Sequence, residues 1–340
     1  MSPSTSLSIS DHLRQELTDK LEKYRHLSDD TPDQGTTNGH GSTDSEQVLN
    51  AILKSDKIAS EEQVGQAVDE YIGGKPLAYI TGQHSFGGLD LTIRRPIYIP
   101  RVETEQWVLL LAKHILDNTP PDKTIRILDI CSGSGCIPLL LALEGKGRIH
   151  TIGLDVDDIA LEVARENAKR NKIDHLSTFQ KLDLFSEQDV ERVRGELGGS
   201  FDLVVSNPPY VSSKDMKEVE TKWHEGKYAL QGKLKDRQRK EGENDNGNDD
   251  DEDDDGYSFY RRILEIYTPF LSSTRPSSIP KLVLEIGSTQ SRPVQEMYRD
   301  QGRMEVYKET ERRKDLSAPK LEHGNMVGTE RSLWIYEKGQ

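Results

Sequence analysis

The segment Asn207-Pro208-Pro209-Tyr210, directly after an apolar run, contains groups that could hold a planar nitrogen for methylation. An amide or exocyclic amine nitrogen is a weak nucleophile, because its lone pair is delocalised into the neighbouring carbonyl or ring. The Asn207 side-chain oxygen and the Pro208 carbonyl can accept its two N–H bonds and turn the lone pair toward a methyl donor. Proline stiffens the turn, and Tyr210 can stack on the planar group. A proline-rich turn that merely ends a strand is the alternative interpretation.

Three more strand-like segments end in residues that suit a nucleoside ligand. Gly133 and Gly135 follow the first and let the backbone approach a ligand closely. Asp155 follows the second, about 20 positions past the glycine loop, and can accept both hydroxyl groups of a ribose. Asp183 follows the third and is a candidate partner for an adenine amino group, with Leu184 for apolar contact. Each feature alone could be a plain turn, a helix cap or a solvated carboxylate, but four suitable strand ends in order favour one ligand site.

The elements that must position these residues alternate between strand and helix. Seven strands are predicted, at 125–130, 149–154, 177–182, 202–206, 282–286, 304–307 and 332–336. Six helices are predicted around them, at 104–117, 136–143, 157–171, 187–197, 257–271 and 293–301. Such alternation implies an α/β fold with a doubly wound sheet and crossover helices. Ligands bind beyond the carboxyl ends of the strands in such a sheet.

A smaller part precedes the sheet. Leu13, Leu17, Leu21 and Tyr24 recur at helical spacing, and two short helices are predicted at 48–53 and 64–72. Residues 1–78 are therefore expected to form a helical domain with a flexible polar linker at 28–45. Residues 79–103 are expected to form a hairpin and linker, because strand-forming residues between 79 and 99 are interrupted by two glycines. The sheet domain then occupies 104–340.

Charge narrows the class of partner. The 340 residues carry a formal net charge of −14, and ten acidic residues without Lys or Arg lie between 241 and 255. The rest of the chain is at −4, which is nearly balanced. A groove for a nucleic-acid duplex favours a basic excess, so we expect no stable nucleic-acid partner. The acidic run predicts a disordered insertion over 233–255, with a regulatory or partner-binding role as the alternative.

Cys131 and Cys136 are the only cysteines, and their spacing fits neither a redox pair nor a zinc site. We therefore expect reduced thiols in an intracellular protein and no bound metal. The longest apolar run, 137–143, is too short to span a bilayer, so no membrane association is expected. The serine-rich start with Arg14 is a weak mitochondrial presequence signal, because acidic residues dilute it.

Together these motifs resemble the HemK/PrmC family of protein-glutamine methyltransferases. The resemblance covers roughly residues 74–336 and includes the segments 74–82, 99–105 and 228–230, the glycine loop, the Asn207 turn and Glu285-Ile286-Gly287. The pairing of the Pro-Arg-x-Glu-Thr-Glu segment at 100–105 with Asn-Pro-Pro-Tyr is its specific signal. The family uses S-adenosyl-L-methionine to methylate the glutamine side-chain amide in the Gly-Gly-Gln motif of peptide-chain release factors. The resemblance implies that activity in translation termination, on a Rossmann-like class I methyltransferase sheet.

The resemblance also implies roles for individual residues. Asn207 and Pro208 would grip the glutamine amide, with Pro209 in the same turn, and Tyr210 would close over it. The residues implied for the cofactor are Asp129, Cys131, Gly133, Gly135, Asp155, Asp183, Leu184 and Asn207. Arg101, Glu103 and Thr104 would form the pocket wall, with a surface charge cluster or helix N-cap as the alternative. The helical domain and the residues near 80–86 would dock the release factor to a monomeric enzyme.

The chain departs from the family pattern in three places. Cys131 stands where many relatives have glycine, and insertions lie at 232–254 and 320–327. Long serine- and acid-rich segments look eukaryotic, and the eukaryotic form with an attached helical domain is organellar. We therefore expect a mitochondrial protein, with the cytoplasm as the alternative. An amino methyltransferase acting on DNA or RNA bases and a non-catalytic binding module of the same fold are the rival interpretations.

Overall fold

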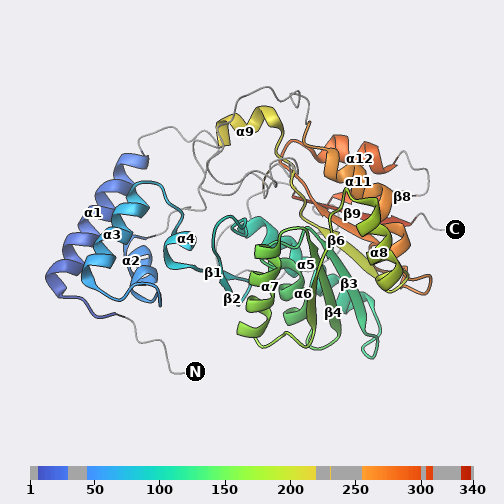
Figure 1. The fold of residues 1–340 in the computed structure, drawn as a ribbon, viewed down its shortest axis with the longest axis horizontal. Coiled ribbons are helices and arrows are strands. Elements are labelled where there is room, and N and C mark those ends of the chain that lie inside the picture. The colour runs from blue at the N-terminus through green and yellow to red at the C-terminus, as the bar shows by residue number, and fades with distance from the viewer. Residues whose placement is uncertain are drawn as a thin grey trace.

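The computed structural model describes residues 7–29, 44–219, 230, 255–299, 304–308 and 331–337. Figure 1 shows a group of N-terminal helices, a small hairpin, and a large sheet with helices packed against it. Most of the predicted linker 28–45 and of the acidic insertion 233–255 lies outside the described residues. The insertion at 320–327 and residues 228–229 of the family-like segment 228–230 also lie outside them.

The large sheet has seven strands in the order β5-β4-β3-β6-β7-β9-β8. They are β3 (Ile125–Ile130), β4 (Ile149–Asp155), β5 (Ser177–Lys181), β6 (Leu203–Ser206), β7 (Leu282–Glu285), β8 (Met304–Lys308) and β9 (Ser332–Glu337). The first five in this order are parallel, and β9 runs antiparallel to both its neighbours. The predicted seven-stranded doubly wound α/β sheet is therefore confirmed. Strands β3 and β6 lie side by side although β4 and β5 separate them in sequence, which makes their junction the switch point where ligands bind.

Helices cover both faces of this sheet. The helices packed on the sheet are α5 (Val102–Asn118), α6 (Cys136–Glu144), α7 (Asp158–Arg170), α8 (Glu187–Leu197), α11 (Ser258–Ile266) and α12 (Ser291–Arg299). Along β3, Ile125 and Ile127 belong to the core shared with α5, α6 and α7, whereas Leu128 and Ile130 belong to the core shared with α8, α11 and α12. Successive side chains of a strand point to opposite faces. A strand that is apolar on both faces therefore binds helices on both faces.

The strand register brings the carboxyl ends of the central strands level with one another. Ile130 pairs with Leu154 of β4 on one side and with Ser206 of β6 on the other. The Ser206 hydroxyl also donates a 2.6 Å hydrogen bond to the carbonyl of Ile130. The loops that follow β3, β4 and β6 therefore leave the sheet at the same edge.

The N-terminal helices have a core of their own. Helices α1 (Asp11–Asp29), α2 (Ser45–Leu53) and α3 (Glu61–Ile72) bury apolar side chains against one another. After them come α4 (Leu77–Thr81) and the antiparallel strands β1 (Gln83–Phe86) and β2 (Leu89–Thr92). Leu89 and Leu91 of β2 are buried in the core beneath α6 and α7. The hairpin is thus packed onto the sheet domain, where Thr92 N donates to Asn167 Oδ1 of α7 over 2.7 Å.

Two predicted elements differ in the structure. The hairpin was expected from residue 79, but residues 77–81 are helical because Pro76 starts a turn at φ −56° and Gly82 ends it at φ +75°. The helix expected over 257–271 stops at Ile266 and continues as the short 3-10 helix η2 (Thr268–Phe270). Pro269 lies in η2 and has no N–H to continue an α-helix. A short helix not predicted from sequence, α9 (Ser213–Val219), follows the Asn207 turn.

Among the described residues, none of the helices combines the length and the apolar character needed to cross a bilayer. The same residues contain no group of three or more His, Cys, Asp or Glu side chains arranged to hold a metal ion.

Candidate active site

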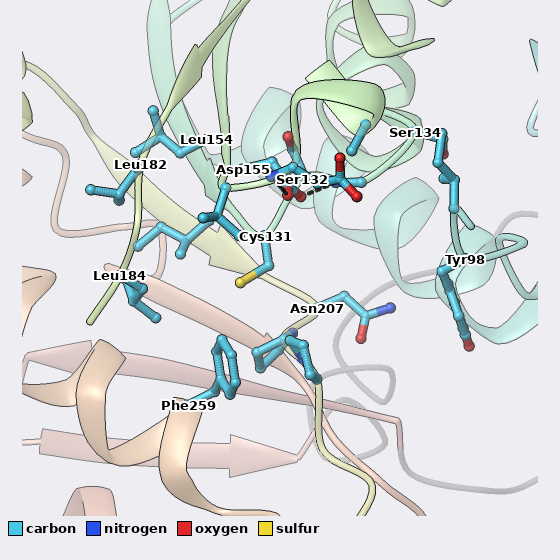
Figure 2. Close-up of a pocket in the computed structure, with 18 of the residues that line it drawn as sticks. Tyr98, Cys131, Ser132, Ser134, Leu154, Asp155, Leu182, Leu184, Asn207 and Phe259 are labelled. Carbon is cyan, nitrogen blue, oxygen red and sulfur yellow. Dashed lines mark hydrogen bonds between the residues drawn. The ribbon is translucent and has the colours of Figure 1, made fainter. Parts of the chain in front are cut away.

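A single cavity runs along the carboxyl edge of the sheet and joins the loops after β3, β4, β5 and β6. Its empty volume is about 1210 Å³ with its open mouth included. Of the predicted site residues, those that line it are Cys131, Gly133, Asp155, Asp183, Leu184, Asn207, Pro208, Pro209 and Tyr210. Figure 2 shows Asp155 and the loop of Ser132 on one side of this cavity and Asn207 on another, with Cys131 between them. The four strand ends selected from the sequence therefore meet in one place.

The glycine loop after β3 is shaped by two glycines with different requirements. Gly133 has φ +53°, and a Cβ atom built there would meet nothing within 4 Å. Gly135 has φ +80°, and its Cβ would lie 2.9 Å from the Phe179 ring. Gly133 thus needs only a left-handed backbone, whereas Gly135 also needs the absence of a side chain so that α7 and β5 can pack behind the loop.

Cys131 occupies the first position of this loop with φ +64°, a left-handed conformation that is unusual for a residue other than glycine. Its sulfur points into the cavity beside Asn207 (Figure 2). Burial raises the pKa of the thiol well above its usual value, and the charges of Asp155 and Asp129 add to this effect. The thiol is therefore neutral at physiological pH and contributes shape rather than nucleophilicity to the cavity.

Asp155 at the end of β4 is fixed by backbone N–H groups. Its Oδ2 accepts from Gly133 N over 2.8 Å, and its Oδ1 accepts from Asp157 N over 3.0 Å. Burial raises the pKa of this carboxyl group, and the hydrogen bonds from Asp157 and Gly133 oppose that rise. Each carboxylate oxygen has more than one lone pair. Asp155 can therefore accept further hydrogen bonds from a ligand without losing those that orient it.

The cavity wall near β5 is apolar, with Asp183 at its end. Leu154, Leu182 and Leu184 form this wall (Figure 2), and the Asp183 Oδ1 atom accepts from Phe185 N over 3.0 Å. Such a wall with one acceptor at its rim suits a flat, weakly polar ring that carries an amino group.

The Asn207 turn contributes two hydrogen-bond acceptors to the lining of the cavity. Asn207 is partly exposed on the cavity side of the turn (Figure 2). Within the described part of the chain, neither its side-chain amide nor the carbonyl oxygen of Pro208 forms a hydrogen bond. Both residues line the cavity, so these acceptors are available to a ligand bound there.

Tyr210 closes the same turn. Burial, and then the charge of Glu285, raises the pKa of its phenol to about 12. Glu285 ends β7, is buried, and accepts from Trp107 Nε1 over 2.8 Å. Tyr210 is thus a neutral aromatic wall and not a base at physiological pH.

Five predicted site residues do not line the cavity. Asp129 is fully buried within β3, beneath the loop, and neither carboxylate oxygen has a hydrogen-bond partner among the described residues. Gly135 lies on the packed side of the loop. Arg101, Glu103 and Thr104, the expected pocket wall, are not among the residues that line the cavity. Helix α5 begins at Val102, and Thr104 is buried in the interior. The Arg101 guanidinium lies one layer back, 4.8 Å from the ring centroid of Tyr98.

Sequence reasoning missed two aromatic residues that do line the cavity. Tyr98, just before the Pro-Arg segment, lies across the cavity from Asn207 (Figure 2). Phe259 of α11 forms a second wall and packs edge-on against Phe185, with ring centroids 5.0 Å apart. The neighbouring Pro100-Arg101 motif was the only available signal for Tyr98. Nothing in the helical pattern of α11 singled out Phe259.

A seven-stranded sheet of this order, with a glycine loop, an acidic strand end and an Asn-Pro-Pro-Tyr turn around one cavity, defines a class I methyltransferase. The family model described as methyltransferase small domain matches residues 108–226. A Streptococcus pneumoniae protein named release factor glutamine methyltransferase is 32% identical over 248 residues, which are 72% of this chain and 74% of that protein. A Bacillus anthracis protein of the same name is 30% identical over 242 residues, or 67% of this chain and 75% of that protein. The chain belongs to the release factor glutamine methyltransferase family.

A solved structure titled human methyltransferase 10 domain containing protein is also similar. It is 16% identical, with a TM-score of 0.43, and the match covers 74% of this chain and 90% of that chain.

Proposed function

We propose that this protein transfers a methyl group from S-adenosyl-L-methionine to the side-chain nitrogen of a glutamine in a peptide-chain release factor. One observation carries this function: the free acceptors of Asn207 and Pro208 share a cavity with Gly133 and Asp155. Family membership supports the choice of acceptor, because the relatives are named for release factor glutamine.

The residues around the cavity fit this donor. Asp155 would hold the ribose hydroxyl groups, and Asp183 with the leucine wall would hold the adenine. The Ser132 hydroxyl lines the cavity and has no hydrogen-bond partner among the described residues. It leaves hydrogen-bonding capacity at the glycine loop for a polar ligand. The donor supplies a methyl group on a positively charged sulfur.

Positioning is the main contribution of this chain to the reaction. Asn207 Oδ1 and the Pro208 carbonyl would accept the two N–H bonds of the glutamine amide, which fixes the plane of the amide and the direction of its lone pair. Tyr98, Tyr210 and Phe259 would enclose this plane and exclude water. An oriented, desolvated nitrogen loses little further entropy in the transition state.

No strong base is needed. The amide nitrogen becomes acidic once it carries the new methyl group, so one N–H proton can leave to water past the Asn207 and Pro208 acceptors. Tyr210 does not take up this proton, because its raised pKa of about 12 keeps the phenol protonated at physiological pH. Bond formation to nitrogen therefore precedes loss of the proton.

The helices before residue 79 offer a separate surface, because they have their own core beside the sheet domain (Figure 1). We propose that this part docks the release factor and that the protein acts as a monomer without stable nucleic-acid partners. A mitochondrial location is supported by the attached helical part and by the long serine- and acid-rich segments, and not by the start of the chain, where acidic residues dilute the presequence signal. A fluorescent fusion that fills the cytoplasm and leaves mitochondria dark would refute that location.

Mass spectrometry of a purified release factor incubated with enzyme and labelled donor tests the activity. The expected result is one labelled methyl group on the glutamine of the Gly-Gly-Gln motif. Labelling of DNA or RNA but not of the release factor would instead identify a nucleic-acid amino methyltransferase. Donor binding without any transfer would identify a non-catalytic module.

A further inference from the structure

The Asn207 turn is held from behind by a side chain outside the cavity. Gln290 lies between β7 and α12, is buried, and does not line the cavity. Its Nε2 donates to the carbonyl of Tyr210 over 3.0 Å and to the carbonyl of Gly256 over 3.3 Å. Its Oε1 accepts from Gly287 N over 3.1 Å and from the Tyr260 hydroxyl over 3.4 Å.

This amide uses both of its donors and both of its acceptor positions. The partners come from three separate segments: the turn after β6, the stretch from Gly256 into α11 that includes Tyr260, and the loop after β7. The orientation of the amide follows from these partners, because two carbonyl groups require the NH₂ end and two donors require the oxygen. No other uncharged side chain of this length offers that combination, so glutamine is specifically required.

The three segments that Gln290 contacts are closely packed around it. A Cβ atom on Gly287 would lie 2.7 Å from Gln290 Oε1, and a Cβ on Gly256 would lie 2.6 Å from the Tyr210 carbonyl oxygen. Both glycines are needed for the backbone to approach this closely. A shift of one segment would therefore be passed to the others.

The partners of Gln290 are themselves fixed. The single Tyr260 hydroxyl proton is shared between Gln290 Oε1 and the nearer carbonyl of Glu285, at 3.0 Å, and the Tyr298 hydroxyl donates to the carbonyl of Tyr260 over 2.8 Å. Asp255, one residue before Gly256, forms an ion pair with Arg261. Gln290 thus ties the Asn207 turn to helix α11 and to the end of β7, which are rigid elements.

We propose that Gln290 is a positioning residue, which clamps the backbone of the Asn207-to-Tyr210 turn and so sets the direction of the Asn207 carboxamide. This role rests on the proposed function, since it concerns the orientation of the Asn207 carboxamide, which would bind the substrate amide. Gln290 itself touches neither substrate nor donor. Its loss should lower kcat and leave donor affinity intact.

The test compares Gln290→Glu with Gln295→Glu. The Gln290 variant keeps the shape but cannot donate two hydrogen bonds to the two carbonyl groups. Gln295 is also buried and also belongs to this helical region, but its Nε2 has no hydrogen-bond partner within the described residues. It therefore reports the general cost of placing a carboxyl group in α12.

The expected result for Gln290→Glu is a fall in kcat of roughly ten- to a hundredfold, since a displacement of about 1 Å can cost that much. Donor affinity by calorimetry should match that of Gln295→Glu. Hydrogen exchange in peptides covering 207–212 should be faster than in the control, with no substrate present. A kcat and an exchange rate equal to those of Gln295→Glu would refute the clamp.

Gly256→Ala provides a second route if Gln290→Glu fails to fold. Its Cβ would lie 2.6 Å from the Tyr210 carbonyl oxygen and 3.1 Å from Gln290 Nε2, so it should push these groups apart, lower kcat and speed exchange at the turn. Unchanged values in this folded variant would refute the clamp as well. If the wild-type enzyme does not methylate a release factor, the proposed function fails, and the exchange comparison still decides whether Gln290 holds the turn.

Discussion

Replacing Asn207 by alanine should nearly abolish turnover and leave donor binding almost unchanged. Asn207 is partly exposed, and its side chain has no hydrogen-bond partner within the described residues. Its removal should therefore change the free energy of unfolding by no more than about 0.5 kcal/mol. The donor half of the cavity, around Gly133 and Asp155, is held by its own hydrogen bond and should persist.

The expected loss of rate has two parts. A hydrogen bond from the amide N–H that strengthens as positive charge develops on nitrogen contributes about 1.5–3 kcal/mol. Loss of orientation adds about 2.7 kcal/mol, because a misplacement of about 1 Å can cost 10²-fold in rate. The sum of about 4–6 kcal/mol corresponds to a fall in kcat of roughly 10³- to 10⁴-fold.

The assay measures methyl transfer to a release factor at saturating donor and substrate, alongside donor affinity by calorimetry. Asn207→Asp is the matched variant, since it keeps an acceptor oxygen and the same shape. It should retain more activity than Asn207→Ala if acceptance of the N–H bond is the function of this residue. An alanine variant that loses donor affinity together with turnover, or that keeps more than about a tenth of kcat, would refute this division of labour.

Three other perturbations test the site and the fold. Asp155→Ala should weaken donor affinity at least about tenfold, the cost of leaving hydroxyl groups unpaired; unchanged affinity in calorimetry would remove this residue from the site. Glu285→Gln should become more stable relative to wild type as pH rises above about 4.5, because burial raises the pKa of Glu285 in the folded state. Folded wild-type protein binds the Glu285 proton more tightly than the unfolded chain does, so the stability of the wild type falls as pH rises through that range. Urea denaturation at several pH values should show that the free energy of unfolding of the variant exceeds that of wild type by an amount that grows with pH. A difference that stays constant with pH would contradict this prediction. Gly135→Ala should destabilise the fold by about 2–4 kcal/mol, because its Cβ overpacks the space behind the loop and its backbone is left-handed. Gly133→Ala should cost only about 1–2 kcal/mol, because its backbone is left-handed but its Cβ has open space. Equal costs in urea denaturation would show that packing behind the loop is unimportant.

Hydrophobic periodicity was sufficient to predict the sheet. The strand predicted at 125–130 agrees with β3 in full, and the helix predicted at 187–197 agrees with α8. These elements are predictable because their burial patterns are regular and their boundaries carry glycine, proline or capping residues. The errors at 79–81 and 267–271 occurred where a proline decided between two local structures. A pattern of apolar residues does not distinguish one short turn of helix from a strand.

The sequence by itself also determined which chemical groups belong to the site. Asn207, Asp155, Asp183 and Gly133 each follow a predicted strand, and parallel strands place their carboxyl ends at one edge. Their convergence therefore follows from connectivity alone, without knowledge of the distances. The Asn-Pro-Pro-Tyr turn and the acidic strand ends were identifiable for this reason.

Only the tertiary structure decided which neighbours complete and support that site. Tyr98 and Phe259 reach the cavity from segments far from the strand ends, Arg101 lies behind the cavity wall, and Gln290 ties three segments together from about 80 residues beyond the turn. Such roles depend on packing between elements distant in the chain, and a local sequence pattern contains no information about that packing. The sequence therefore identifies the reactive residues, whereas the packing of the folded chain determines how their side chains are oriented.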